Sequence, residues 1–488
     1  MSGVLYLGFD VGTQSTKALV IDGASGEVVA RAASGYELIS GLPPGAAEQH
    51  PDTWWQALRA CCRELASRVD LARVRALGVS GQQHGFVPLD AEQRVLRAAK
   101  LWCDTSTSEE AAELSRAIGR AVPTGFTASK ILWMKRREPA LFARLRHVLL
   151  PHDWVNLRFT GRLAMEAGDA SGTGVFDVAA RRFDPRACSA IDAHLQEWLP
   201  PLVGPAEPIG TLRPEIAREL SLPAGALVAP GSGDNMCAAI GSVATREGIA
   251  VLSLGTSATL FARASSPVID PAGLIAPFCD ATGAWLPLLC VMNATGVLHE
   301  VARAFPGEDL HSLTRAAEQV SCGCDGLLCV PFLQGERVPD LPNATGSLLG
   351  WRPGLLTPGH LFRATLEGIS MNLAGGLERL RSLGLAIDAV RLVGGGAKNA
   401  FWAQMLADAL GVRVQRLAEP ESAALGAALQ AQAVAEGRSC DEVASRAIAL
   451  DGAPFLPEPA RVAAYRALRS RFEAAVAATA QPFAADAR

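Results

Sequence analysis

Two segments of this sequence combine glycine with small hydroxyl residues directly after an apolar run. They are Gly12-Thr13-Gln14-Ser15-Thr16 and Gly255-Thr256-Ser257, whose glycines stand 243 positions apart. Glycine lets the backbone approach an anion closely, while backbone N–H groups and hydroxyls supply hydrogen-bond donors. Because a second apolar run follows each segment, we expect two β-hairpin tips that hold phosphate. Lys17, five residues after Gly12, adds a cation to the first tip.

Two aspartates near these tips could take part in proton transfer. Asp234 lies in Gly231-Ser232-Gly233-Asp234-Asn235, after an apolar stretch, and Asp10 precedes the first tip. A carboxylate held between glycines after a strand can reach into a cleft and accept the proton of an attacking hydroxyl. Asp234 is therefore the candidate general base. The alternatives are structural, since Asp234 could cap a following helix and Asp10 could start a turn.

A loop rich in amides and glycine follows the apolar stretch at residues 74–79. It contains Gln83 and His84, and Trp102 and Asp104 follow about twenty positions later. Amide and imidazole groups match the hydroxyls of a polyhydroxylated molecule, and an indole packs on its C–H face. A satisfied structural histidine and a core tryptophan are the alternatives.

A third glycine-rich segment, Gly394-Gly395-Gly396-Ala397, is followed by Asn399. It would bring the backbone close to a nucleoside that Asn399 could hydrogen-bond, although such a run is also typical of a plain turn. The segment has no G-x-G-x-x-G spacing, which argues against a dinucleotide-binding fold.

The elements that must position these residues occur in the same order in both halves. The first half predicts strands at 5–9, 18–22 and 27–30, a helix at 51–69, and strands at 74–79 and 226–230. The second half predicts strands at 248–252, 258–262 and 285–291, a helix from 296 to 305, a strand at 389–393, and helices at 400–410 and 461–478. Residues 244–247 form the expected crossing between the halves.

Composition and charge narrow the class of protein. Of the 488 residues, 49% are hydrophobic and 19% charged, with a net charge of −4, so nothing favours nucleic acid or an anionic membrane as a partner. The 11 cysteines are scattered, and Cys322 and Cys324 lack the further ligands that zinc would need. No leader pattern opens the chain and no apolar run approaches membrane-spanning length. We expect a soluble cytoplasmic protein with free thiols.

The duplicated strand order and the paired tips resemble the actin-like ATPase superfamily, and within it the FGGY carbohydrate kinases. The resemblance runs from Tyr6 to about Leu429, and it is carried by residues 9–13 with Lys17, 80–85, 101–104, 125–133 around Lys130, 231–235, 253–257, 335–337, 364–367 and 394–399. It implies an α/β fold of two actin-like (ribonuclease H-like) domains, each a mixed βββαβαβ sheet flanked by helices, around an interdomain cleft. Residues 1–244 would hold the sugar site and first phosphate loop, and residues 245–488 the second phosphate loop and adenosine site.

The resemblance also implies a role for each candidate residue. Asp234 would be the general base and Asp10 would lie near Mg²⁺, and these two carboxylates would suffice for a metal that keeps several waters. The substrate-binding residues would be Gln83, His84, Trp102, Asp104 and Asn235. The ATP-binding residues would be Gly12, Thr13, Ser15, Thr16, Lys17, Gly255, Thr256, Ser257, Gly395, Gly396, Ala397 and Asn399.

The implied activity is ATP-dependent phosphorylation of a ketose, with D-xylulose as the leading substrate and ATP and Mg²⁺ as cofactors. Gln83 departs from the pattern of many bacterial members, which have Met before the histidine, and glycerol kinases place an Arg-Glu pair here. Trp351 and Arg137 also depart from the family signatures, at positions not expected to touch substrate. Another ketose or polyol, such as ribulose or glycerol, and an actin-like ATPase without a sugar substrate remain as alternatives. The oligomeric state, a homodimer included, stays open.

Overall fold

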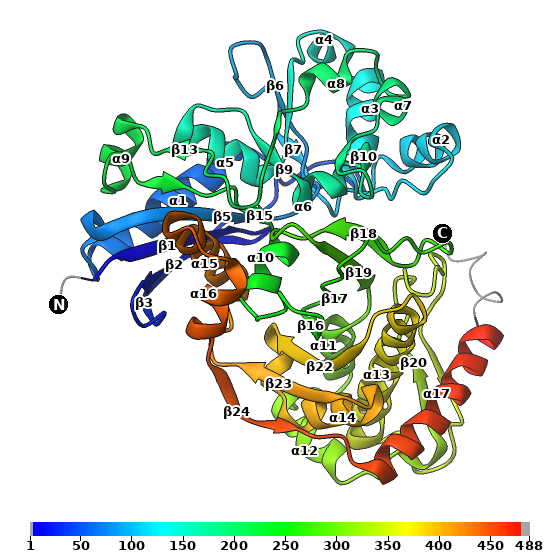
Figure 1. Cartoon of the computed structure of the whole chain (residues 1–488). Coiled ribbons are helices and arrows are strands. Elements are labelled where there is room, and N and C mark those ends of the chain that lie inside the picture. The colour runs from blue at the N-terminus through cyan, green and yellow to red at the C-terminus, as the bar shows by residue number, and fades with distance from the viewer. Residues whose placement is uncertain (1–2, 480–488) are drawn as a thin grey trace.

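The computed structural model describes residues 3–479 and contains two seven-stranded sheets, one in each half of the chain (Figure 1). The first has the order β13-β14-β5-β1-β2-β3, with β15 paired to β5, and the second has the order β18-β19-β17-β16-β22-β23-β24. The strands of the first sheet are β1 (Leu5–Val11), β2 (Ser15–Asp22), β3 (Val28–Gly35), β5 (Val74–Gly81), β13 (Gly210–Thr211), β14 (Leu227–Val228) and β15 (Ser232–Gly233). The strands of the second sheet are β16 (Gly248–Leu254), β17 (Ala258–Ala262), β18 (Ala276–Cys279), β19 (Trp285–Val291), β22 (Ile387–Val393), β23 (Arg413–Leu417) and β24 (Leu450–Phe455).

The two sheets repeat one topology. β1 pairs antiparallel with β2 and parallel with β5, and β16 pairs antiparallel with β17 and parallel with β22. Both central strands are buried along most of their length, as strands covered by helices on both faces must be. This arrangement confirms the predicted α/β fold with two sheet-containing domains. The sequence did not predict β18, whose four residues include Pro277 and give little strand signal.

Helices cover both faces of the sheets. They are α1 (Pro51–Ala66), α10 (Asp234–Ile240), α11 (Thr295–Arg303), α12 (Leu310–Glu318), α13 (Pro358–Ser382), α14 (Ala400–Leu410), α15 (Ser422–Glu436), α16 (Cys440–Ala447) and α17 (Pro459–Thr479). The predicted helices at 51–69, 400–410 and 461–478 are confirmed as α1, α14 and α17. The sequence missed α13, because every residue from Phe362 to Ala374 is buried and the pattern therefore has no polar face.

A long insertion between β5 and β14 forms the upper lobe in Figure 1. Its helices are α2 (Ser108–Ile118), α3 (Thr127–Arg137), α4 (Pro139–Phe142), α5 (Pro151–Thr160), α6 (Ala167–Ala170), α7 (Pro185–Ser189), α8 (Leu195–Trp198) and α9 (Pro214–Leu220). Its strands are β6 (Val87–Leu89), β7 (Ala99–Lys100), β8 (His147–Leu149), β9 (Met165–Glu166), β10 (Phe176–Asp177), β11 (Arg182–Phe183) and β12 (Leu202–Val203), and β4 (Glu48–Gln49) pairs with β7. The second half adds the hairpin β20 (Leu328–Val330) and β21 (Ser347–Leu349).

Two helices join the halves. α10 follows the first sheet, but its Met236 and Ile240 share a core with Val251 and Phe261 of the second sheet. α15 belongs to the second half by sequence and packs on the first sheet, where a Cβ at Gly8 would overlap the backbone of the helix. Because α10 of the first half packs on the second sheet and α15 of the second half packs on the first sheet, the two halves contact each other along these helices. The predicted boundary at residues 244 and 245 stays a prediction.

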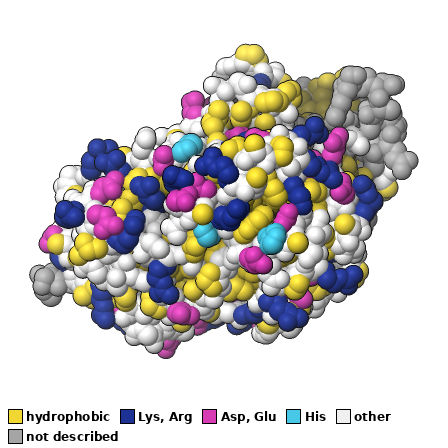
Figure 2. Space-filling view, turned by 90° about the horizontal axis from the view of Figure 1, so that it is seen from above, with side chains coloured by type: hydrophobic (Ala, Val, Ile, Leu, Met, Phe, Trp, Pro, Cys, Tyr) yellow, Lys and Arg dark blue, Asp and Glu magenta, His cyan; other side chains and the backbone are white. Residues whose placement is uncertain are grey.

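The composition led to expectations about the charged surface, the cysteines, the helix lengths and possible metal clusters. Basic and acidic side chains are interspersed on the face seen in Figure 2, without a large patch of one sign. All eleven cysteines are free thiols. Within residues 3–479, no helix is long and apolar enough to cross a membrane, and no three His, Cys, Asp or Glu side chains gather as a metal cluster.

Candidate active site

The first glycine-threonine tip joins β1 to β2 and is held by side chains from other elements. Gly12 N–H donates to the Ser15 carbonyl at 3.0 Å, which closes the turn. The Gly12 carbonyl accepts from Tyr36 Oη at 2.7 Å, and the Thr13 carbonyl accepts from Gln49 Nε2 at 2.7 Å. Because protein donors bind the Gly12 and Thr13 carbonyl oxygens, these oxygens do not repel an anion bound at the tip.

The threonine hydroxyls of the first tip are committed to protein partners. Thr13 Oγ1 accepts from Trp102 Nε1 at 3.0 Å and donates to Gln82 Oε1 at 3.0 Å. Thr16 is buried, and its hydroxyl lies 3.3 Å from Tyr36 Oη. Their predicted contacts with ATP therefore gain no support from this geometry, which leaves the backbone N–H groups after Gly12 as the candidate phosphate donors of this tip.

The second tip joins β16 to β17 and has the same backbone closure, because Gly255 N–H donates to the Ser257 carbonyl at 2.9 Å. Here the support comes from the start of α11. The Gly255 carbonyl accepts from Thr295 N–H at 3.0 Å and from Thr295 Oγ1 at 2.7 Å, and the Thr256 carbonyl accepts from Gly296 N–H at 3.2 Å. The sequence predicted a helix at this place but not that its first residues hold the tip.

The glycine triplet lies beside the second tip, because β22 runs parallel to β16 and both end at the same edge. A Cβ at Gly394 would stand 2.6 Å from the Leu254 carbonyl, so only glycine allows this approach. Gly395 faces open space. Asn399 is turned inward instead, since it caps α14 through Trp402 N–H at 3.0 Å and donates to Thr314 Oγ1 at 3.0 Å. Gly395 is thus available to a nucleotide, while the amide of Asn399 is occupied.

Lys17 contacts a carboxylate from the second half of the chain. Its Nζ lies 2.5 Å from Glu421 Oε2, and both side chains line a pocket of about 260 Å³. Lys17 stands opposite Asp10 in the β1–β2 register. The cation is therefore near the predicted site, but with a protein partner.

Asp10 lies near the end of β1, and Asp234 directly follows β15; both strands pair with β5. Asp10 Oδ1 accepts from Ser80 Oγ at 2.9 Å, and β15, which leads into Asp234, pairs with β5 at Ser80 and Gly81. Burial raises the pKa of Asp10 to about 6. Burial, and next the negative charge of Asp10, raise the pKa of Asp234 to about 7. Two nearby carboxylates that repel each other fit a divalent cation, which would remove that repulsion.

Asp234 opens α10 and keeps one oxygen free of protein donors within the described residues. Its Oδ1 accepts from Asn235 N–H at 2.7 Å and from Asn235 Nδ2 at 2.8 Å. The same Nδ2 donates to Gln83 Oε1 at 2.8 Å, and Thr259 Oγ1 donates to Asn235 Oδ1 at 3.1 Å. Asn235 therefore connects the predicted base, the sugar loop and the second sheet.

Gln83 and His84 keep buried polar atoms that have no hydrogen-bond partner in the described residues, namely Gln83 Nε2 and His84 Nδ1. A buried donor or acceptor without a partner is costly, which favours a ligand or water at this place. The ring of His84 lies 4.5 Å from that of Phe126 and stacks on Phe278, a residue of β18, at 5.8 Å. Burial lowers the pKa of His84 well below its usual value, so the imidazole is neutral.

The structure does not bring Asp104 to this place. Asp104 is fully buried, and its oxygens accept from Lys100 Nζ at 3.0 Å, from Ala47 N–H at 2.9 Å and from Ser106 Oγ at 2.6 Å. The Asp104 carboxylate forms a buried ion pair with Lys100, so we leave Asp104 out of the proposed sugar site. Trp102 does reach the site, through its bond to Thr13.

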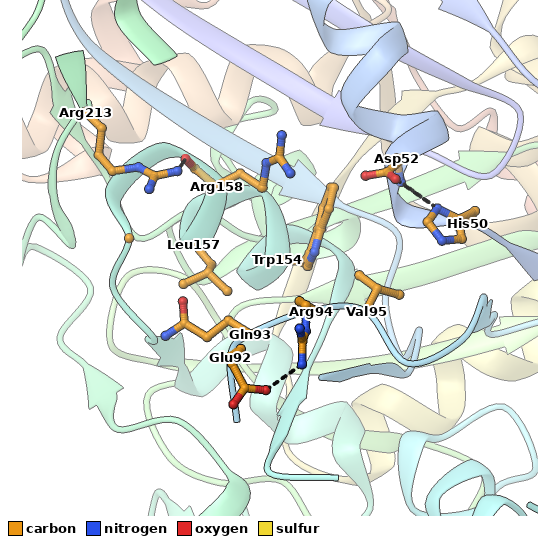
Figure 3. A pocket seen from close by; sticks show the side chains of 11 residues that line it. His50, Asp52, Glu92, Gln93, Arg94, Val95, Trp154, Leu157, Arg158 and Arg213 are labelled. Atoms are coloured by element: carbon orange, nitrogen blue, oxygen red, sulfur yellow. Dashed lines mark hydrogen bonds and ion pairs between the residues drawn. The ribbon is translucent and has the colours of Figure 1, made fainter. Parts of the chain in front are cut away.

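The sequence missed several residues that shape the site, namely Tyr36, Gln49, Gln82, Phe126, Phe278 and Thr295. Gln82 and Phe126 lie within the segments 80–85 and 125–133 that carry the family resemblance, although no role was assigned to them, whereas the other four stand in segments that gave no signal for this role. Figure 3 shows a different pocket, of about 410 Å³, lined by residues that include His50, Arg94 and Arg158. No predicted site residue lines it, and Arg94 is paired with Glu92, so this pocket lies apart from the site.

Comparisons with known proteins agree with the fold. The N-terminal domain model of the FGGY family of carbohydrate kinases matches residues 5–241, and the C-terminal domain model matches residues 250–435. A protein of Haemophilus influenzae named xylulose kinase is 40% identical over 88% of this chain and 90% of its own length. One of Escherichia coli with the same name is 36% identical over 96% and 98%. A crystal structure described as a xyloylose kinase from Brucella ovis has a TM-score of 0.91 at 33% identity, covering 97% of this chain and 99% of its own. With both domain models and these relatives spanning its length, the chain belongs to the FGGY family of carbohydrate kinases.

Proposed function

We propose that this protein transfers the γ-phosphoryl group of ATP to D-xylulose and releases D-xylulose 5-phosphate and ADP. The substrate is supported by relatives named xylulose kinase at 36–40% identity over most of the chain. The observation that carries the reaction is the position of Asn235, whose amide joins Gln83 to the Asp234 carboxylate. A hydroxyl bound at Gln83 would therefore lie beside the base.

In the proposed mechanism Asp234 accepts the proton of the attacking sugar hydroxyl on its free oxygen. Phosphoryl transfer needs little covalent help from the protein, so positioning and charge compensation do most of the work. Asp10 and Asp234 would hold Mg²⁺, partly through water, and the metal would neutralise charge on the β- and γ-phosphates. The N–H groups of the two tips would bind the phosphate oxygens, and residues 394–397 would lie against the adenosine.

The neutral ring of His84 and the amide of Gln83 would recognise the sugar. The Gln83 amide has a buried nitrogen without a partner in the described residues, which a hydroxyl or carbonyl oxygen of the ketose would satisfy, while Nδ1 of His84 lies against Gly172. A sugar lacking that group would leave the polar atom buried and unpaired, which is how such sites discriminate. Phe278 reaches His84 from the second sheet. Closing the halves over the sugar would therefore exclude water from the transferring phosphate.

The test is ADP release, measured with a coupled assay, for D-xylulose, ribulose, glycerol and ATP alone. We expect D-xylulose to give the highest kcat/KM and to stimulate ADP release roughly a hundredfold or more over ATP alone. A ranking led by ribulose or glycerol would overturn the substrate but keep the mechanism. ADP release that no sugar stimulates would overturn the kinase reaction itself.

The proposal includes compartment and assembly. A cytoplasmic location is supported by the use of ATP and by eleven free cysteines, which suit a reducing compartment. A homodimer is supported by large apolar side chains at the surface near β21, because Trp351 is 64% exposed and Leu348 is 46% exposed. Light scattering at micromolar concentration measures the mass, and a monomer would contradict the dimer.

A further inference from the structure

The loop before Asp234 is held mainly by side chains of other elements and makes few strand hydrogen bonds of its own. Between β14 and α10, Ser232 and Gly233 pair with β5 and Ala229 N–H donates to the Leu77 carbonyl of β5, but within the described residues Pro230 and Gly231 do not pair with a strand. Gly231 has a φ of 71°, and a Cβ there would overlap the Val79 carbonyl, so the backbone is tightly packed in a conformation that favours glycine. Small shifts of the loop are therefore prevented by its contacts.

Three buried side chains hold three consecutive residues of this loop. Asn156 Nδ2 donates to the Pro230 carbonyl at 2.8 Å, and Ser232 Oγ donates to Glu166 Oε1 at 2.7 Å. The third is Gln430, whose Oε1 accepts from Gly231 N–H at 2.8 Å and whose Nε2 donates to the Gly231 carbonyl at 3.3 Å. Asn156 and Glu166 come from the first half of the chain, whereas Gln430 comes from α15.

Gln430 also reaches the second sheet. Its Nε2 lies 3.4 Å from the Ala281 carbonyl, two residues beyond the end of β18. β18 carries Phe278, which stacks on His84 in the sugar site. The side chain of Gln430 is completely buried, so water does not replace these bonds. One amide therefore connects the strand that covers the sugar to the loop that carries the base.

We propose that Gln430 is a positioning residue, which couples the closure of β18 over the sugar to the placement of Asp234. When β18 moves towards His84, Ala281 moves with it, and the amide of Gln430 fixes Gly231 three residues before the base. Without this amide, the Gly231 N–H and carbonyl lose their shared partner, and side-chain bonds hold the loop only at Pro230 and Ser232 on either side. A shift of about 1 Å at a reacting group can cost about a hundredfold in rate. The inference rests on Asp234 acting as the base but not on the identity of the sugar.

The test compares Gln430→Met with Gln432→Met. Gln432 is a second buried glutamine on α15, but its Nε2 donates to the Gly23 carbonyl at 2.9 Å, away from the base loop. We expect Gln430→Met to lower kcat roughly ten- to a hundredfold, with the KM for ATP within about twofold of wild type, and Gln432→Met to keep kcat. We also expect Gln430→Met to hydrolyse more ATP per sugar phosphorylated, because base placement no longer follows closure.

Equal losses of kcat in the two variants, or an unchanged kcat in Gln430→Met, would overturn the inference. If Gln430→Met does not fold, the inference can still be tested on the wild-type protein. Hydrogen exchange of the Gly231 amide should slow when sugar binds, and an unchanged exchange rate would also overturn the inference. All rates are compared with wild type on the sugar that the wild type prefers. Failure of D-xylulose as the substrate would therefore be seen in the wild type alone and not be confused with failure of this coupling.

Discussion

Asp234→Asn should lower catalysis and raise stability at the same time. Asparagine keeps the size of the side chain and an oxygen that can accept from Asn235 N–H, as Asp234 Oδ1 does at 2.7 Å. The substitution removes only the negative charge and the ability to take a proton. If Asp234 served only at the start of α10, where Gly233 is the N-cap, the variant would keep its activity, because asparagine suits a helix start as well as aspartate does.

The magnitudes follow from the surroundings of the carboxylate. Loss of a general base costs about 10²- to 10⁴-fold in kcat, or about 3–5 kcal/mol. Burial and the charge of Asp10 raise the pKa of Asp234 from 3.8 to about 7. Because the folded pKa is above the unfolded one, the carboxylate lowers stability increasingly as the pH rises from about 4 to 7, and by a constant amount above that. Three units correspond to at most about 4 kcal/mol, and partial solvation reduces our expectation to about 1–2 kcal/mol.

The two readouts are sugar-stimulated ADP release and urea unfolding at pH 8 in EDTA without ligands. EDTA keeps metal from masking the repulsion between Asp10 and Asp234. Asp104→Asn is the matched control, since it removes the partner of buried Lys100 and should destabilise the protein. An Asp234→Asn variant with activity within a few-fold of wild type, or with reduced stability, would refute the assignment of the base.

Three further predictions concern other parts of the site. Gly172→Ala should raise the KM for sugar about tenfold or more and leave the KM for ATP unchanged, because a Cβ at residue 172 would overlap the ring of His84. Gly375→Ala is the control and should leave the kinetics unchanged, because a Cβ at residue 375 would meet open space. Equal kinetics of the two variants would contradict this prediction. Lys130→Met should remove a pH dependence of stability, because burial lowers the pKa of Lys130 to about 7. Between pH 7 and about 10 the unfolded chain therefore binds one more proton at Lys130 than the folded chain does. In the wild type this makes the free energy of unfolding rise with pH by up to about 1.4 kcal/mol per pH unit. Urea unfolding of both proteins at pH 7.5 and 9.5 measures this, and a constant difference would argue against it. Lys17→Met should raise the KM for ATP about tenfold if the cation serves phosphate, and an unchanged KM would mean that it serves only its ion pair.

The fold and the backbone of the site could be predicted because they depend on local patterns. Apolar runs that end in glycine and threonine gave both tips, and their order along the chain gave the duplicated sheets. α13 could not be found in this way, since a helix buried on all sides has no periodicity to detect. β18 was missed because it is short and contains Pro277, and with it Phe278, which stacks on His84.

The side-chain partners could not be predicted, because residue type does not say which polar group a side chain will meet. Thr13 has the right type for a phosphate donor, but its hydroxyl is taken by Gln82 and Trp102, which are 69 and 89 positions away. Asp104 has the right type for a sugar ligand, but Lys100 takes its charge. Such contacts are made between segments that only the complete fold brings together.

The duplication therefore ends at the backbone, and the two tips differ in what holds them. Both tips close with the same glycine N–H bond, but the first is held by side chains of Tyr36 and Gln49, and the second by the start of α11. The first tip is also bonded, through Thr13, to Trp102 beside the sugar loop. Trp102 thus links a predicted sugar-binding residue to the first tip, and the Thr259–Asn235 bond links another to β17, the strand that follows the second tip. The halves thus share a fold, but different elements hold their two tips.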